Sequence, residues 1–170
     1  MGQNDDKTVR FNGLKSGVYA FGVELDDAFF ESFENEEIKG GKVHFDINLE
    51  RTAGVMMFTF VFDGEVTTVC DRCLGAMTVR VKGDDVLNVR FSDTETTDDE
   101  NTVILPEQAT EIDLSPWLYE YVAVRLPLQH THPDGECDPE MVKYLVDEEA
   151  KPADGYVDPR WEALKKVLND

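Results

Sequence analysis

Basic residues are scarce in this chain. Its 170 residues include 16 lysines and arginines against 36 aspartates and glutamates, so the formal net charge is −20 at pH 7. The average surface repels phosphate, which excludes diffuse electrostatic binding to nucleic acid and leaves only a local basic patch for any RNA contact. A basic protein is the partner that such a charge attracts by long-range steering. The other interpretation is that the charge serves solubility alone.

Long apolar runs are also missing. The longest, residues 55–62, is interrupted by Thr59 and is far too short to cross a bilayer. The first six residues lack the basic and apolar regions of a secretory leader. We therefore expect a cytoplasmic protein that does not contact membranes. Its length and its apolar fraction of 41% suit a single domain, residues 1–170, with a buried core.

Cysteine is rare, and the motifs of common enzymes are absent. Three cysteines, an odd number, fit reduced thiols or metal ligands better than a secreted disulfide framework. The sequence contains no glycine-rich phosphate loop, no internal repeat and no nucleophile with an identifiable base. We expect a protein that is not an enzyme.

Two of the cysteines form a Cys-x-x-Cys motif, Cys70 and Cys73. Two thiolates at this spacing supply half of a tetrahedral zinc site. The other half is expected in residues 130–137, which contain His130, His132 and Cys137. Three cysteines and one histidine would close the coordination shell, so a zinc ion here would be structural.

Two other interpretations of the Cys-x-x-Cys motif remain. A redox pair normally opens a helix after a strand, whereas residues 76–82 alternate as a strand does, which makes thiol redox activity the weaker functional alternative. The remaining interpretation is that the cysteines are ordinary small apolar residues and the histidines lie in a solvated loop.

Apolar residues alternate with polar ones at residues 42–50, as in a strand with one solvated face, whereas residues 55–62 are apolar on both faces, as in a central strand. With the shorter runs that follow, they predict a five-stranded antiparallel meander or partly closed barrel. His44 falls on the polar face, so we interpret it as an exposed strand histidine. We expect turns at Asp63-Gly64 and at Gly83-Asp84. The predicted strands are residues 42–50, 55–62, 65–70, 76–82 and 85–91.

Helical spacing appears before and after these strands, so the predicted fold class is α+β with C-terminal helices. The acidic residues 92–101 should form a mobile loop. One helix is expected within residues 23–33, capped by Asp26 or Asp27, and a second from Pro116 to about Arg125, capped by Ser115. A third should lie near residues 141–146 and be opened by Asp138-Pro139. The last is an amphipathic helix at residues 157–170.

The basic residues that could contact RNA cluster around the Cys-x-x-Cys motif. Arg80 and Lys82 should project from one face of a strand, and the apolar Met77, Val79 and Val81 from the other. Arg72 lies within the Cys-x-x-Cys motif, and Arg90 lies on the next predicted strand, residues 85–91. The equally favoured alternative is a solvated sheet face with scattered ion pairs.

Five motifs in order over residues 60–170 resemble the YceD-like family, which is named for accumulation of large-subunit ribosomal RNA and was formerly a domain of unknown function. They are residues 70–74, 111–114, Leu126-Pro127, the following His/Cys loop and residues 158–164. The resemblance implies a non-enzymatic factor in ribosome biogenesis that supports accumulation or processing of large-subunit ribosomal RNA. Its partners would be precursor ribosomal RNA or a basic ribosomal protein. The alternative is a zinc-stabilised acidic interaction module or chaperone for such a protein.

The same resemblance selects one histidine as a metal ligand. Some relatives carry a cysteine-rich segment after the Leu-Pro pair, and its cysteines would fall near His132 and Cys137. This chain keeps one of those cysteines and has histidine near the other position, an exchange that zinc accepts. The resemblance therefore implies a zinc site of Cys70, Cys73, His132 and Cys137, with His132 preferred over His130.

Overall fold

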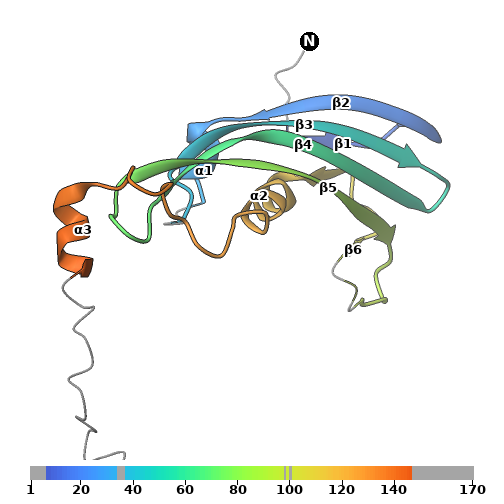
Figure 1. Cartoon of the computed structure of the whole chain (residues 1–170). Helices are drawn as coiled ribbons and strands as arrows, with labels where there is room; N and C mark the ends of the chain where they lie inside the picture. The colour runs from blue at the N-terminus through green and yellow to red at the C-terminus, as the bar shows by residue number, and fades with distance from the viewer. Residues whose placement is uncertain (1–6, 34–36, 98, 100, 147–170) are drawn as a thin grey trace, which may run out of the picture.

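The computed structural model describes residues 7–33, 37–97, 99 and 101–146 (Figure 1). A five-stranded sheet has the order β2-β3-β4-β5-β6, and β1 pairs with β7 in a separate ribbon. All pairings are antiparallel except that of β5 with β6. The elements are β1 (Thr8–Arg10), β2 (Gly17–Leu25), α1 (Asp27–Glu31), β3 (Gly40–Arg51), β4 (Val55–Val69), β5 (Ala76–Phe91), β6 (Thr102–Leu105), β7 (Glu111–Asp113), α2 (Ser115–Ala123) and α3 (Pro139–Val146).

The sheet is open, and α1, α2 and β1 lie on one side of it (Figure 1). Its inner face carries fully buried aromatic side chains such as Phe45, Phe58 and Phe60, which pack in one core with Leu118 and Val122 of α2. This arrangement confirms the predicted α+β class and the meander, which is antiparallel from β2 to β5, whereas the fifth strand, β6, adds in parallel. The sheet is open, so it is not a barrel. No helix in the described part of the chain is long and apolar enough to span a membrane.

The two predicted turns at glycine are wrong, because β4 and β5 each run straight through them. A Cβ on Gly64 would lie 2.3 Å from the carbonyl oxygen of Lys42, and one on Gly83 would lie 3.0 Å from the ring of Phe62. These glycines let a neighbouring strand or ring approach closely, which is the other role of glycine within a strand. Four of the predicted strands therefore form two long ones.

The N-terminal part of the expected helix at residues 23–33 is also wrong, because Val23 to Leu25 belong to β2, a strand that the sequence analysis missed. The helix itself, α1, begins at Asp27. Asp26 is its N-cap and accepts a hydrogen bond from the backbone N–H of Phe29 at 3.0 Å. Leu25 satisfies both the strand period and the helix period, which concealed the boundary.

The later helices are confirmed with changed ends. Ser115 is not the N-cap of α2; the carboxylate of Asp113 instead accepts hydrogen bonds from the backbone N–H and hydroxyl of Ser115, at 2.9 and 2.7 Å. The helix ends at Ala123 rather than near Arg125. Asp138 accepts a hydrogen bond from the N–H of Glu140 at 2.9 Å and opens α3 as expected.

Some predictions fall outside what the structure describes. The helix expected at residues 157–170 lies beyond the described residues. The single domain over residues 1–170 stays a prediction. The described residues of the 92–101 loop connect β5 to β6. Within it, Asp99 accepts a hydrogen bond from the hydroxyl of Thr102 at 2.7 Å. The mobility of this loop stays a prediction.

Candidate metal centre

Cys70 and Cys73 lie in the tight connection between β4 and β5. The N–H of Cys70 donates to the carbonyl of Gly75, and the N–H of Leu74 donates to the carbonyl of Cys70, both at 2.8 Å. Leu74 has a φ of 57°, the left-handed conformation that non-glycine residues rarely adopt. Both ends of the connection continue into paired strands, so the sheet holds the two thiols in place.

The segment before α3 supplies the other two side chains, and a pair of hydrogen bonds joins it to the Cys-x-x-Cys connection. The N–H of Asp71 donates to the carbonyl of His130 at 2.6 Å, while the carboxylate of Asp71 accepts from the N–H of His130 at 2.7 Å. Arg72 forms an ion pair with Asp134 at 3.7 Å. These contacts bring His132 and Cys137 to the thiols of Cys70 and Cys73.

Cys70, Cys73, His132 and Cys137 offer four ligand atoms within 4.8 Å of one another. The Sγ atoms of Cys70 and Cys137 are 3.9 Å apart, and Nδ1 of His132 lies 3.4 Å from Sγ of Cys73 and 3.9 Å from Sγ of Cys137. Zinc–sulfur bonds of about 2.3 Å in tetrahedral geometry place two sulfurs about 3.8 Å apart. The structure therefore brings the four predicted side chains together, and the distances between their ligand atoms suit one zinc ion.

The orientation of His132 also suits a ligand. Its Nε2 lies 3.2 Å from the carbonyl oxygen of Ala76, so this nitrogen carries the proton and donates to that oxygen. Nδ1 then presents its lone pair to the thiols, which is the usual arrangement of a metal-binding histidine. His130 contributes backbone contacts instead, and its Nε2 is buried without a partner among the described residues.

All three thiols are buried, and the surroundings favour thiolate at two of them. Burial raises the pKa of Cys70, but backbone hydrogen bonds at Cys73, His132 and Arg72 outweigh it and bring the pKa to about 6. Backbone hydrogen bonds at Asp138 and Gly75 lower the pKa of Cys73. Burial raises the pKa of Cys137. Because zinc binds thiolates, these backbone donors prepare the Cys-x-x-Cys pair for a metal.

The four candidate basic residues do not form a free basic patch. Arg80 forms two hydrogen bonds with the carboxylate of Asp63, at 3.1 and 3.0 Å, and Arg90 pairs with Glu95 at 2.7 Å. Arg72 is paired with Asp134, as described above. Lys82 is exposed and has no ion-pair partner among the described residues, although Asp63 faces it on β4. Carboxylates therefore offset most of this positive charge.

His44 is exposed on β3, as expected, but it belongs to a charged cluster that sequence reasoning missed. Its Nδ1 lies 2.7 Å from Glu24 and its Nε2 lies 3.4 Å from Asp46. The hydrogen bond to Glu24 is the main cause that raises the pKa of His44. The sequence could have indicated the contact of His44 with Asp46, because residues two apart on a strand lie on the same face. The contact with Glu24 depends on β2.

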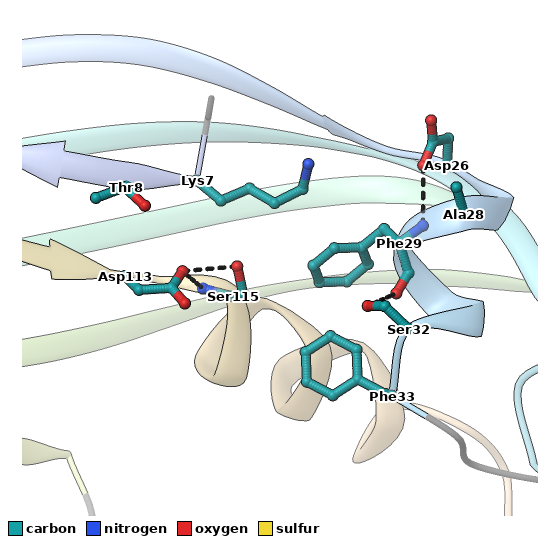
Figure 2. A pocket seen from close by; sticks show the side chains of 9 residues that line it. All are labelled: Lys7, Thr8, Asp26, Ala28, Phe29, Ser32, Phe33, Asp113 and Ser115. Atoms are coloured by element: carbon teal, nitrogen blue, oxygen red, sulfur yellow. Dashed lines mark hydrogen bonds between the residues drawn. The ribbon is translucent and has the colours of Figure 1, made fainter. Parts of the chain in front are cut away.

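A hollow of about 460 Å³ lies between β1, α1 and the start of α2 (Figure 2). Nζ of Lys7 lies 5.4 Å from the centre of the Phe29 ring there. Four of the polar side chains around the hollow bond to the protein itself: Asp26 caps α1, Asp113 accepts from Ser115, and the hydroxyl of Ser32 donates to the carbonyl of Phe29. These contacts stabilise helix ends and give the hollow no evident ligand chemistry.

Comparison with known proteins identifies a family. No curated protein and no solved structure matches the chain significantly. Residues 58–168 match the protein family described as "Large ribosomal RNA subunit accumulation protein YceD". The matched region includes β5, the helices α2 and α3, and all four side chains of the candidate metal centre. The match covers more than half of the sequence, and the chain therefore belongs to the YceD family.

Proposed function

We propose that this protein is a non-enzymatic cytoplasmic factor in ribosome biogenesis that supports accumulation of large-subunit ribosomal RNA by binding a basic ribosomal protein. Family membership supports the ribosomal role. The choice of a basic protein as the partner rests on one observation: carboxylates already pair with Arg72, Arg80 and Arg90. With a net charge of −20 and most of its basic cluster offset by carboxylates, the surface suits a basic protein better than phosphate.

The proposed metal has a structural role within this function. Zinc held by Cys70, Cys73, His132 and Cys137 would connect the β4–β5 hairpin to the segment that leads into α3. Four protein ligands leave no open position for water or substrate, so the ion would stabilise the fold without catalysing a reaction. Because the site joins distant parts of the chain, metal binding would be coupled to folding of the region after α2.

Direct contact with precursor ribosomal RNA is the second candidate. Arg80 and Lys82 are both exposed on β5, two residues apart on one face. The ion pairs of the cluster are solvent-exposed, and such pairs contribute only about 0–1 kcal/mol each, so a phosphate can displace a carboxylate from them. RNA binding by this route would depend strongly on salt concentration.

The two candidates differ in what remains bound after RNA is destroyed. Tagged protein should be purified from growing cells with and without ribonuclease, followed by identification of bound proteins and sequencing of bound RNA. We expect a basic ribosomal protein to remain after ribonuclease treatment and to be released by high salt. Loss of all ribosomal partners with ribonuclease would favour RNA contact instead.

A further inference from the structure

β2 forms one edge of the main sheet, and the described part of the chain places no strand on its outer side. All nine of its residues, Gly17–Leu25, pair in continuous register with β3. In Figure 1, β2 is the long upper rim of the sheet. An edge strand presents unpaired N–H and C=O groups, to which another extended segment can add by hydrogen bonding.

This edge lacks the features that usually prevent strand addition. Natural edge strands are blocked by lysine, by proline, by a bulge or by being very short. β2 is nine residues long, has no lysine or proline, and its only charged residue is Glu24. Its continuous register with β3 contains no bulge.

The two faces beside this edge have different chemistry. On the core side, Tyr19 and Phe21 are only half-buried, although Val23 and Leu25 farther along β2 are fully buried. On the solvent side, Ala20 and Gly22 have little or no side chain, which leaves a hollow of about 390 Å³. Its lining consists of Ala20, Phe21, Gly22, Asp46, Ile47 and Asn48. An added strand would cover the aromatic rings with one face and lie beside this hollow with the other.

Carboxylates dominate the solvent side of the β2–β3 pair. Glu24 opposes His44, Gly22 opposes Asp46 and Val18 opposes Glu50 in the register. His44 is the one basic side chain among these positions and already contacts Glu24 and Asp46. Lys42 lies beyond the last β2 pair, which joins Leu25 to Val43. The solvent face of an added strand would therefore meet negative charge.

We propose that β2 binds an extended segment of a basic protein as an additional strand, in which lysine or arginine alternates with apolar residues. The basic side chains face Glu24, Asp46 and Glu50, and the apolar ones cover Tyr19 and Phe21. A second copy of this chain suits the edge less well, because it brings the same carboxylates and another net charge of −20 to the interface. The inference rests on the proposed function, for which it names the binding surface.

The direct test is amide hydrogen exchange, measured by NMR on the full chain with a nine-residue capped peptide in which lysine alternates with valine. We expect the peptide to slow exchange of β2 amides. The same peptide with alternate backbone nitrogens methylated should have no such effect, because it cannot form the ladder. Binding without protection of β2 overturns the proposal. Slow exchange of the outer β2 amides in the protein alone also overturns it, because the edge is then already covered.

A matched pair of variants tests the charge argument. Asp46 and Asp84 lie in the same cross-strand row, Gly22–Asp46–Val61–Asp84, but Asp84 is on β5, far from the edge. Asp46→Lys should weaken peptide binding about five- to tenfold, as expected for replacing an exposed ion pair by repulsion. Asp84→Lys should weaken it less than about twofold, by the same reasoning on distance and screening. Equal weakening by both would show unspecific charge attraction and overturn the proposal.

These outcomes are separate from those that test the function. Peptide binding is measured on purified protein, whereas the role in ribosomal RNA accumulation is measured in cells. If β2 does not bind the peptide but depleted cells lose large-subunit RNA, only the strand-addition proposal fails. If β2 binds the peptide but depleted cells keep normal RNA, the proposed function fails.

Discussion

The Sγ atoms of Cys70 and Cys137 lie 3.9 Å apart, although these residues are 67 positions apart in the sequence. This contact joins the β4–β5 hairpin to the start of α3. Among the described residues, the buried cluster that the two segments share is small and consists of the three cysteines with Met77 and Val142 packed against it. A metal ion would add strong bonds where the apolar core contributes little.

The first prediction concerns the metal. The purified protein should bind one zinc ion, and chelation should lower its thermal midpoint because metal binding is coupled to folding. His132→Ala should weaken zinc binding at least about tenfold, because a tetrahedral site loses one of its ligands. The measurements are zinc content and a competition titration with a chromophoric chelator.

His130→Ala is the matched control for the metal prediction. His130 contacts Asp71 through its backbone, so its side chain is dispensable for that contact. The variant should keep zinc affinity near that of the unmodified protein. If His130→Ala loses zinc and His132→Ala keeps it, the assignment of the fourth ligand is wrong.

The second prediction concerns packing at glycine. Gly64→Ala should destabilise the protein by about 2 kcal/mol, because the new methyl group would meet backbone atoms of β3 that cannot move aside cheaply. Gly54→Ala should change stability by less than about 1 kcal/mol, since nothing lies within 4 Å of its Cβ position. Urea unfolding of both variants measures the difference. Equal stabilities would show that β4 and β3 do not approach as described.

The third prediction concerns pH. Glu24 holds the pKa of His44 above its ordinary value of 6.5. A histidine with a raised folded-state pKa contributes stability below the unfolded value, and this contribution is lost as pH rises through the folded value. Stability from this cluster should therefore decline from about pH 6.5 upward. The contribution is small because the side chain is about half exposed, 49%.

NMR titration of the imidazole gives the most direct reading of this cluster. The pKa of His44 should lie above 6.5 in the unmodified protein and should fall in Glu24→Ala, which removes both the hydrogen-bond acceptor and the charge. An unchanged pKa in that variant would show that Glu24 is not the cause. A pKa below 6.5 in the unmodified protein would contradict the described contacts.

The fourth prediction separates the two partner classes. Combined charge reversal at Arg72, Arg80 and Lys82 should weaken association with pre-ribosomal particles if RNA contacts this face. Neutralising Asp98, Asp99 and Glu100 should weaken a basic-protein contact instead if that protein also contacts the acidic loop 92–101. Asp98 and Glu100 lie outside the described residues. Asp99 also bonds to Thr102, so Asp99→Asn needs a check of folding by circular dichroism.

The sequence predicts the metal centre better than the sheet. The Cys-x-x-Cys motif and the His/Cys loop carry strong chemical constraints, and the structure brings the predicted four side chains together. A glycine between apolar runs can form a turn, or it can lie within a strand where a neighbouring chain or ring approaches closely. Local sequence does not distinguish these two roles at Gly64 and Gly83. Only the position of a neighbouring backbone or ring decides between them.

The pairing of the basic residues with carboxylates was the least predictable part of the site. Arg80 is paired with Asp63 across two strands, and Arg72 with a residue from a distant loop. Such pairs depend on strand register and loop position, which charge spacing along one segment does not reveal. The alternative of a solvated face with ion pairs, which was raised from the sequence, describes Arg72, Arg80 and Arg90 well.

The proposed role of this protein is to support accumulation of large-subunit ribosomal RNA. The most direct test is the ratio of large- to small-subunit ribosomal RNA in cells depleted of the protein, measured together with ribosomal subunit profiles. We expect a lower ratio and a deficit of free large subunits, both restored by the unmodified protein. A normal ratio with normal subunit profiles would contradict it.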